Sequence, residues 1–189
     1  MFDLKEFRAF VGEALRIVVI SLLIILPIRY FVTQPFFVRG ASMEPSFLDG
    51  DYLIIDELSY RFYEPRRGDT VVFRFPGDPS QFYIKRVIGL PGETLQIHDG
   101  SVYIQRQSDA QPWKLSEPYL GDLQTFGELT ARIDDNKLFV MGDNRAASYD
   151  SRHWGPLPLN AVIGRAWARP WPIEEFGSVN EVQYSEPAL

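Results

Sequence analysis

The chain shows two hydrophobic patterns, one continuous and one interrupted at short intervals. Residues 17–28 are apolar apart from Ser21, which predicts an apolar helix. Beyond residue 33, apolar stretches of strand length alternate with turns rich in Gly, Asp and Pro, a cadence typical of antiparallel sheets. We therefore expect a mostly β protein, an antiparallel sheet or barrel-like domain, preceded by one N-terminal helix. The predicted strands are residues 36–38, 52–55, 70–75, 81–88, 138–141 and 161–168.

The N-terminal helix is predicted to cross a membrane. The run 17–28 is shorter than the roughly 17–25 residues that a span needs. Residues 10–32 reach that length if Arg16 and Arg29 extend to the interface. A buried core helix and a cleavable signal peptide are the alternatives, although no small-x-small cleavage site follows the run. We favour an uncleaved transmembrane helix, and the few flanking Lys and Arg residues leave its orientation open.

Residues 94–136 are more polar than the rest of the β region. Two strands, 94–98 and 101–105, are predicted around the turn Asp99-Gly100, and a looser stretch follows. We interpret these residues as a small inserted β subdomain or flap, without identifiable chemistry. The expected organisation is an N-terminal region with the anchor (1–32), a main β domain (33–93 and 137–170), the insertion (94–136) and a C-terminal tail (171–189).

Composition narrows the possible functions. A formal net charge of −6 and a pI near 5.0 argue against a nucleic-acid binder, which needs a basic face. The sequence has no cysteine, which excludes disulfides, a thiol nucleophile and thiolate metal ligands. Its two histidines are too few for a histidine-rich metal site. We therefore expect no metal, no other cofactor and no nucleic-acid partner.

Ser42 lies in a segment that favours a presented hydroxyl. Gly40 and Ala41 are small enough for another backbone to approach, and Pro45 fixes the turn that follows. By itself, however, this segment favours an ordinary solvated loop serine. A reactive Ser42 needs a partner from elsewhere in the chain.

Lys85 is the candidate partner because it occupies an apolar strand face. Alternation within 81–88 places Lys85 on the face of Tyr83 and Val87, opposite Arg86. Burial disfavours the ammonium form and lowers the pKa of a lysine, as a general base near neutral pH requires. The alternative is an exposed lysine that protects a sheet edge from aggregation.

A dense polar loop follows the predicted strand 138–141. Within residues 142–155, Asp143 can pair with Arg145 and Asp150 with Arg152, and such pairs would brace the loop. The alternative is a surface loop whose ion pairs contribute little stability.

Four segments together resemble the characteristic boxes of bacterial type I signal peptidases. In chain order they are Ser42-Met43-x-Pro45, Gly68-Asp69, residues 83–92 and residues 142–155. The resemblance covers residues 36–167, and the single N-terminal anchor agrees with it. It implies a membrane-anchored serine endopeptidase that removes N-terminal signal peptides from exported preproteins. It also implies a single-pass protein of the cell membrane, with the main β domain catalytic and on the extracytoplasmic side.

The resemblance implies a role for each matching residue. Ser42 would be the nucleophile and Lys85 the general base, acting through an acyl-enzyme without histidine. Ser148 would orient the lysine, and the backbone of Ser42, with that of Gly40 or another group, would bind the oxyanion. The residues expected to support this site are Arg86, paired with Asp143, and Arg145, Asp150 and Arg152.

The implied substrate is an extended peptide that adds to a strand edge. Small apolar pockets would accept alanine-like side chains before the cut and reject larger ones by steric clash. Membrane lipid would be a second partner. The residues expected to line the pockets are Phe36, Val38, Met43, Tyr83 and Ile84.

Three other functions stay open at this point. A self-cleaving repressor relative would share a serine/lysine β domain but carry a DNA-binding module, which the apolar N-terminus and acidic charge oppose. A serine/histidine hydrolase could use His153 with Asp150. A non-catalytic, membrane-anchored binding module would keep its function after Ser42→Ala and Lys85→Ala.

Overall fold

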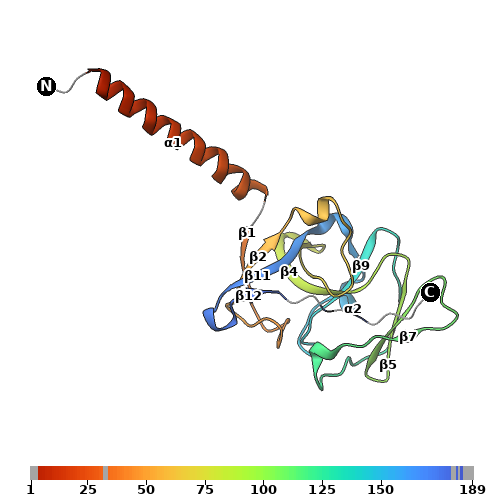
Figure 1. Cartoon of the computed structure of the whole chain (residues 1–189). Helices are drawn as coiled ribbons and strands as arrows, with labels where there is room; N and C mark the ends of the chain where they lie inside the picture. The colour runs from red at the N-terminus through yellow and green to blue at the C-terminus, as the bar shows by residue number, and fades with distance from the viewer. Residues whose placement is uncertain (1–3, 32–33, 180–181, 183, 185–189) are drawn as a thin grey trace.

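A computed structural model describes residues 4–31, 34–179, 182 and 184 of the chain. Its N-terminal helix, α1 (Leu4–Phe31), stands apart from a β region made of two antiparallel sheets (Figure 1). The described apolar side chains of α1, from Phe7 to Leu23, are exposed, so this part of α1 is not a buried core helix. Side chains 24–34 lie outside the described part, and with them one end of the predicted span 10–32. Among the described residues, no helix is both long and apolar enough to traverse a bilayer.

The larger sheet contains strands from both halves of the sequence. Its strands pair in the order β1-β2-β11-β3-β4-β9-β10, with β12 beside β11, and every pair is antiparallel. The strands are β1 (Gln34–Phe37), β2 (Tyr52–Asp56), β3 (Thr70–Phe75), β4 (Asp78–Gly89), β9 (Lys137–Met141), β10 (Leu157–Pro158), β11 (Val162–Trp171) and β12 (Gly177–Ser178).

The smaller sheet comes entirely from residues between Thr94 and Arg132. Its order is β7-β6-β5-β8, again antiparallel. Short helical segments connect the strands of both sheets. The strands are β5 (Thr94–His98), β6 (Ser101–Gln105), β7 (Trp113–Lys114) and β8 (Leu129–Arg132). The short segments are α2 (Ser151–Trp154), η1 (Ser59–Arg61), η2 (Pro118–Leu120), η3 (Leu159–Ala161) and η4 (Ile173–Glu175).

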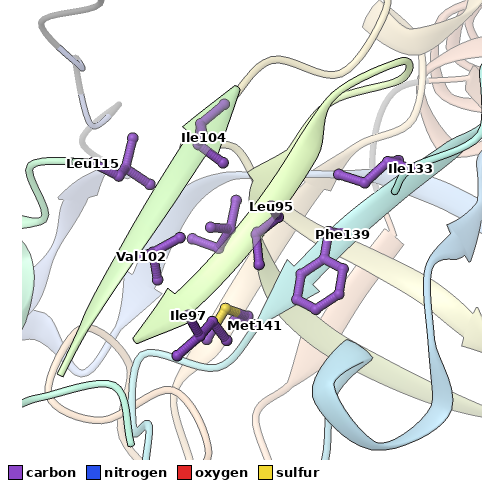
Figure 2. Packing of buried hydrophobic residues seen from close by; sticks show 9 residues of the cluster. Leu95, Ile97, Val102, Ile104, Leu115, Ile133, Phe139 and Met141 are labelled. Atoms are coloured by element: carbon purple, nitrogen blue, oxygen red, sulfur yellow. The ribbon is translucent and has the colours of Figure 1, made fainter. Parts of the chain in front are cut away.

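One hydrophobic cluster joins the two sheets. Leu95 and Ile104 of the smaller sheet pack with Phe139 and Met141 of β9, and Ile88 of β4 belongs to the same cluster (Figure 2). All five side chains are at most 1% exposed, so this contact excludes water. The segment predicted as a possible flap is therefore fixed by a shared core to the strands that lead into the polar loop.

Candidate active site

Ser42 lies in the loop between β1 and β2. Gly40 has φ +83°, in the left-handed region that favours glycine, and turns the chain toward Ser42. The Gly40 N–H donates to Asp49 Oδ1 at 2.7 Å, and the Gly50 N–H donates to the Val38 carbonyl at 3.0 Å. These bonds hold the two ends of the loop together, so the position of Ser42 is well defined.

Lys85 reaches Ser42 from β4. Its strand position is fixed by pairing with Val71 of β3, and its side chain is buried, with only 4% of the residue exposed. Lys85 Nζ donates to Ser42 Oγ at 2.7 Å and to the Ile84 carbonyl at 2.8 Å. Two residues 43 positions apart in the sequence are thus in direct hydrogen-bond contact.

The environment of Lys85 favours its neutral form. Burial lowers its pKa to about 8, although the carboxylates of Asp150 and Asp143 oppose this effect by attracting the ammonium. A lysine with this pKa is partly neutral near pH 7, whereas an exposed lysine is almost fully charged. The geometry and the pKa together fit a base that takes the proton of Ser42.

Two buried ion pairs hold the polar loop against β4 and α2. Arg86 Nε donates to Asp143 Oδ1 at 2.8 Å, so the expected pair of these residues is present. Asp150 pairs with Arg152 at 2.9 Å and also accepts from the Gly142 N–H at 3.0 Å. Burial alone would raise the pKa of Asp150, but Arg152 and the Gly142 N–H outweigh it and lower that pKa.

The predicted local pair of Asp143 with Arg145 is wrong. Arg145 instead forms a two-pronged ion pair with Glu117 of the insertion, with one Nη1–Oε2 distance of 3.0 Å. Arg86 already occupies both carboxylate oxygens of Asp143, so the Arg145 guanidinium bonds other acceptors. Sequence reasoning missed Glu117, whose contact with Arg145 spans 28 residues and has no local signal.

Three further predicted site residues lie differently from expectation. Met43 is completely buried in the core with Val38 and Phe47, and it is not among the residues that line the cavity beside Ser42. The Gly40 N–H is engaged by Asp49 and does not point a free donor at Ser42. The Ser148 hydroxyl is buried and close enough to Asp150 to help lower the pKa of that carboxyl, and its predicted bond to Lys85 is not formed here.

A cavity of about 620 Å³ opens beside Ser42 and Lys85. Four of the five predicted pocket residues line it: Phe36, Val38, Tyr83 and Ile84. Sequence reasoning missed Ala147 and Tyr149, which line the same cavity. Both residues neighbour Ser148 in the polar loop, and this is the signal that could have indicated them. Alternation applies to strands, so it does not tell which side chains of a loop face a cavity.

The edge of β4 is open along this cavity. Pairing of β4 with β9 begins at Arg86, so residues 82–84, which line the cavity, are paired only with β3 among the described strands. Backbone groups on this outward edge can therefore accept an additional strand, although the Ile84 carbonyl already accepts from Lys85 Nζ.

Comparisons with known proteins show which family the chain belongs to. Residues 11–171 match the sequence profile of the signal peptidase family, peptidase S26. The chain belongs to this family. It is 36% identical to a probable signal peptidase I-1 of Synechocystis over 93% of this chain and 90% of that protein. It is 37% identical to a signal peptidase I of Leptolyngbya laminosa, covering 88% and 83%.

Among solved structures, a signal peptidase I from Enterococcus faecalis aligns with 55% of this chain and 97% of its own, with 31% identity and a TM-score of 0.47. The family assignment makes this protein a serine endopeptidase. In this member of the signal peptidase family, no hydrogen bond joins His153 to Ser42 within the described residues. His153 is exposed, and the centroid of its ring lies 5.2 Å from that of Tyr149. Of the two candidate bases, Lys85 is the one that contacts the Ser42 hydroxyl.

Proposed function

We propose that this signal peptidase family member removes N-terminal signal peptides from exported preproteins, with Ser42 as nucleophile and Lys85 as general base. The observation that carries the proposal is the 2.7 Å contact between Lys85 Nζ and Ser42 Oγ at the wall of an apolar cavity. The lowered pKa of Lys85, about 8, supports the base role, because a neutral amine can accept the hydroxyl proton.

In the proposed mechanism, neutral Lys85 takes the proton from Ser42 Oγ as this oxygen attacks the scissile carbonyl carbon. The resulting ammonium then gives the proton to the leaving amine, and the peptide bond breaks to leave an acyl-enzyme on Ser42. Lys85, neutral again, accepts a proton from water, which attacks the acyl carbon. Release of the acid returns the proton to Ser42, so the cycle consumes one water.

The Ser42 N–H is the proposed oxyanion donor. It has no hydrogen-bond partner within the described part of the chain, in contrast to the Gly40 N–H. Ser148 is proposed to orient Lys85: its buried hydroxyl lies next to Gly142, as does the Ser42 carbonyl, and the ammonium formed during the reaction would supply a donor for it. Arg86, Asp143, Arg145, Asp150 and Arg152 are proposed to hold the surrounding loop.

The signal peptide is proposed to bind as a strand along the open edge of β4. Phe36, Val38 and Ile84 would contact its small side chains before the cut, and Ala147 and Tyr149 would close the cavity from the polar loop. Because the cavity walls are backed by buried core residues, they have little room to yield to a larger side chain.

The apolar N-terminal segment is proposed to anchor the protein in the cell membrane by a single span, with the catalytic domain on the extracytoplasmic side. The exposed apolar side chains from Phe10 to Leu23 support this proposal because they pack on no core. Trp167 and Trp171, each more than half exposed, are proposed to contact the membrane interface. The proposed division is anchor 1–32, catalytic domain 33–93 with 137–170, insertion 94–136 and tail 171–189.

The decisive experiment is cleavage of a purified preprotein in detergent or vesicles by wild-type protein and three variants. Ser42→Ala and Lys85→Ala should each abolish cleavage at the signal-peptide junction, while His153→Ala, the matched control for a serine/histidine mechanism, should retain wild-type activity. Circular dichroism should establish that each variant is folded. Cleavage by Lys85→Ala at the wild-type rate would eliminate the proposed mechanism, and intact binding with no cleavage by the wild type would favour a binding module.

A further inference from the structure

Arg145 is the most completely bonded side chain of the polar loop. Its guanidinium has five N–H groups, and all five donate in this structure. The side chain is 1% exposed, so none of these bonds competes with water. The acceptors are both carboxylate oxygens of Glu117, the Tyr119 hydroxyl, the Thr125 hydroxyl and the Gly142 carbonyl.

Four of these five bonds come from the insertion. Glu117 supplies the charge that a buried guanidinium requires, because the nearby carboxylate of Asp143 is already taken by Arg86. Tyr119 adds a second contact, with its ring 4.3 Å from the Arg86 guanidinium carbon. The insertion thus contacts both arginines that fix the segment from Gly142 to Asp143.

The fifth bond reaches the catalytic centre. Arg145 Nε donates to the Gly142 carbonyl at 3.1 Å, while the Gly142 N–H donates to Asp150 at 3.0 Å. The N–H and the carbonyl group of Gly142 are therefore both held by hydrogen bonds. Next to Gly142 lie the Ser42 carbonyl oxygen and the Ser148 hydroxyl, so close that a Cβ at this position would overlap both.

We propose that Glu117 of the insertion is a positioning residue for the Ser42–Lys85 pair, acting through Arg145 on Gly142. This inference rests on the proposed function of that pair. In this arrangement the insertion is a structural support of the active site, and the ion pair with Glu117 keeps the Gly142 carbonyl, and with it the Ser42 backbone, in the geometry that the reaction needs.

The test is a kinetic comparison of full-length variants on a preprotein substrate. Glu117→Gln keeps the size of the side chain and removes its charge, and we expect kcat to fall roughly ten- to a hundredfold with KM changed less than about twofold, since small misplacements of reacting groups cost up to about a hundredfold. Asp109→Asn is the matched control: it removes an ion pair with Arg106 elsewhere in the same insertion and should leave kcat within about twofold of wild type.

A double-mutant cycle separates positioning through Arg145 from general loosening. Adding Glu117→Gln to Arg145→Gln should lower kcat no further than Arg145→Gln alone, because residues of one network are not additive. A wild-type kcat for Glu117→Gln, an equal loss in Asp109→Asn, or full additivity in the cycle would each overturn the inference.

Two further measurements keep the outcome interpretable. If Glu117→Gln does not fold, Thr125→Val replaces it as the test, since this variant keeps the charges and removes one bond to Arg145. Its kcat should fall at least about threefold. An unchanged kcat would overturn the inference. Failure of the proposed function is recognised separately, because Lys85→Ala would then be active whatever Glu117→Gln does.

Discussion

The carbonyl oxygen of Ser42 occupies the space that the first side-chain atom of any residue other than glycine would need at position 142. The Ser148 hydroxyl fills the same space from another side, and Gly142 itself is buried. The polar loop can approach the nucleophile this closely only because position 142 has no Cβ.

Gly142→Ala should therefore damage the site without touching a reactive group. The added methyl would displace Ser42 or Ser148, lowering cleavage by about a hundredfold and the free energy of unfolding by about 1–3 kcal/mol. Cleavage rates and denaturant unfolding measure the two effects. Gly177→Ala is the control, since nothing lies within 4 Å of its added Cβ. Equal activity of Gly142→Ala and wild type would contradict the close approach.

The pH dependence of cleavage should report the pKa of Lys85. Because the neutral amine is the active form and burial lowers this pKa to about 8, kcat/KM should rise about tenfold per pH unit below pH 8 and level off above it. A pH–rate profile of the wild-type protein on a peptide substrate provides the measurement. A histidine base would instead give an inflection near about 6.5, and that result would rule out Lys85.

The same pKa predicts how stability varies with pH. The unfolded value is about 10.4, so between pH 8 and 10 the unfolded chain binds more protons at Lys85 than the folded chain. The free energy of unfolding should then rise with pH in this window, by up to about 1.4 kcal/mol per unit. Below pH 8 the amine is charged in both the folded and the unfolded chain, so the free energy of unfolding is reduced by the full cost of burying the ammonium.

Lys85→Met isolates this contribution. Lys85→Met should have a larger free energy of unfolding than the wild type at pH 7. This advantage should shrink as the pH approaches 10. Denaturant unfolding of both proteins at several pH values gives this difference. A difference that is constant from pH 7 to pH 10 would mean that the amine is not desolvated in the folded protein.

Ile84 should set how large a side chain the cavity accepts before the cut. Ile84→Ala removes three carbons from the wall, so substrates with leucine in place of alanine should gain about ten- to two-hundredfold in relative kcat/KM, the range for small changes in apolar pockets. Ile163→Ala is the matched control, because Ile163 packs on the same core cluster but does not line the cavity. The same gain in both variants would point to general loosening.

A charge on α1 should weaken attachment to lipid in a position-dependent way. Leu22→Arg lies near the middle of the proposed span 10–32 and should cost about 2.5–3.5 kcal/mol of insertion free energy. Val11→Arg, at the end of the span, should cost much less because arginine can extend to the interface there. Vesicle flotation of the full-length proteins compares their attachment to lipid. Wild-type protein that does not float with the vesicles would contradict the proposed anchor.

Local pattern was sufficient for much of the fold. The predicted strands 70–75, 94–98 and 101–105 coincide with β3, β5 and β6, because their alternation is bounded by Gly and Asp turns. The strand predicted as 81–88 begins three residues earlier, at Asp78, since the turn before β4 is tighter than its Pro and Gly residues suggested. The short strands β7, β8, β10 and β12 carry too few residues for a pattern.

The site was predictable where alternation or a motif fixes a side chain, as at Lys85, and not where long-range contacts decide. Met43 lies among the motif residues, yet its side chain is buried in the core with Val38 and Phe47. The partner of Arg145 depends on how the smaller sheet docks on β9, which no local signal encodes.

The chain order from α1 through β1 to Ser42 has one more consequence. Ser42 lies only eleven positions after Phe31, the last residue of α1. At full extension these positions cover at most about 40 Å, and the fold of β1 against β2 shortens this reach further. Under the proposed anchoring by α1, this short connection would hold Ser42 close to the lipid surface. The cleavage site of a preprotein would then be selected by its distance from the bilayer as well as by its sequence.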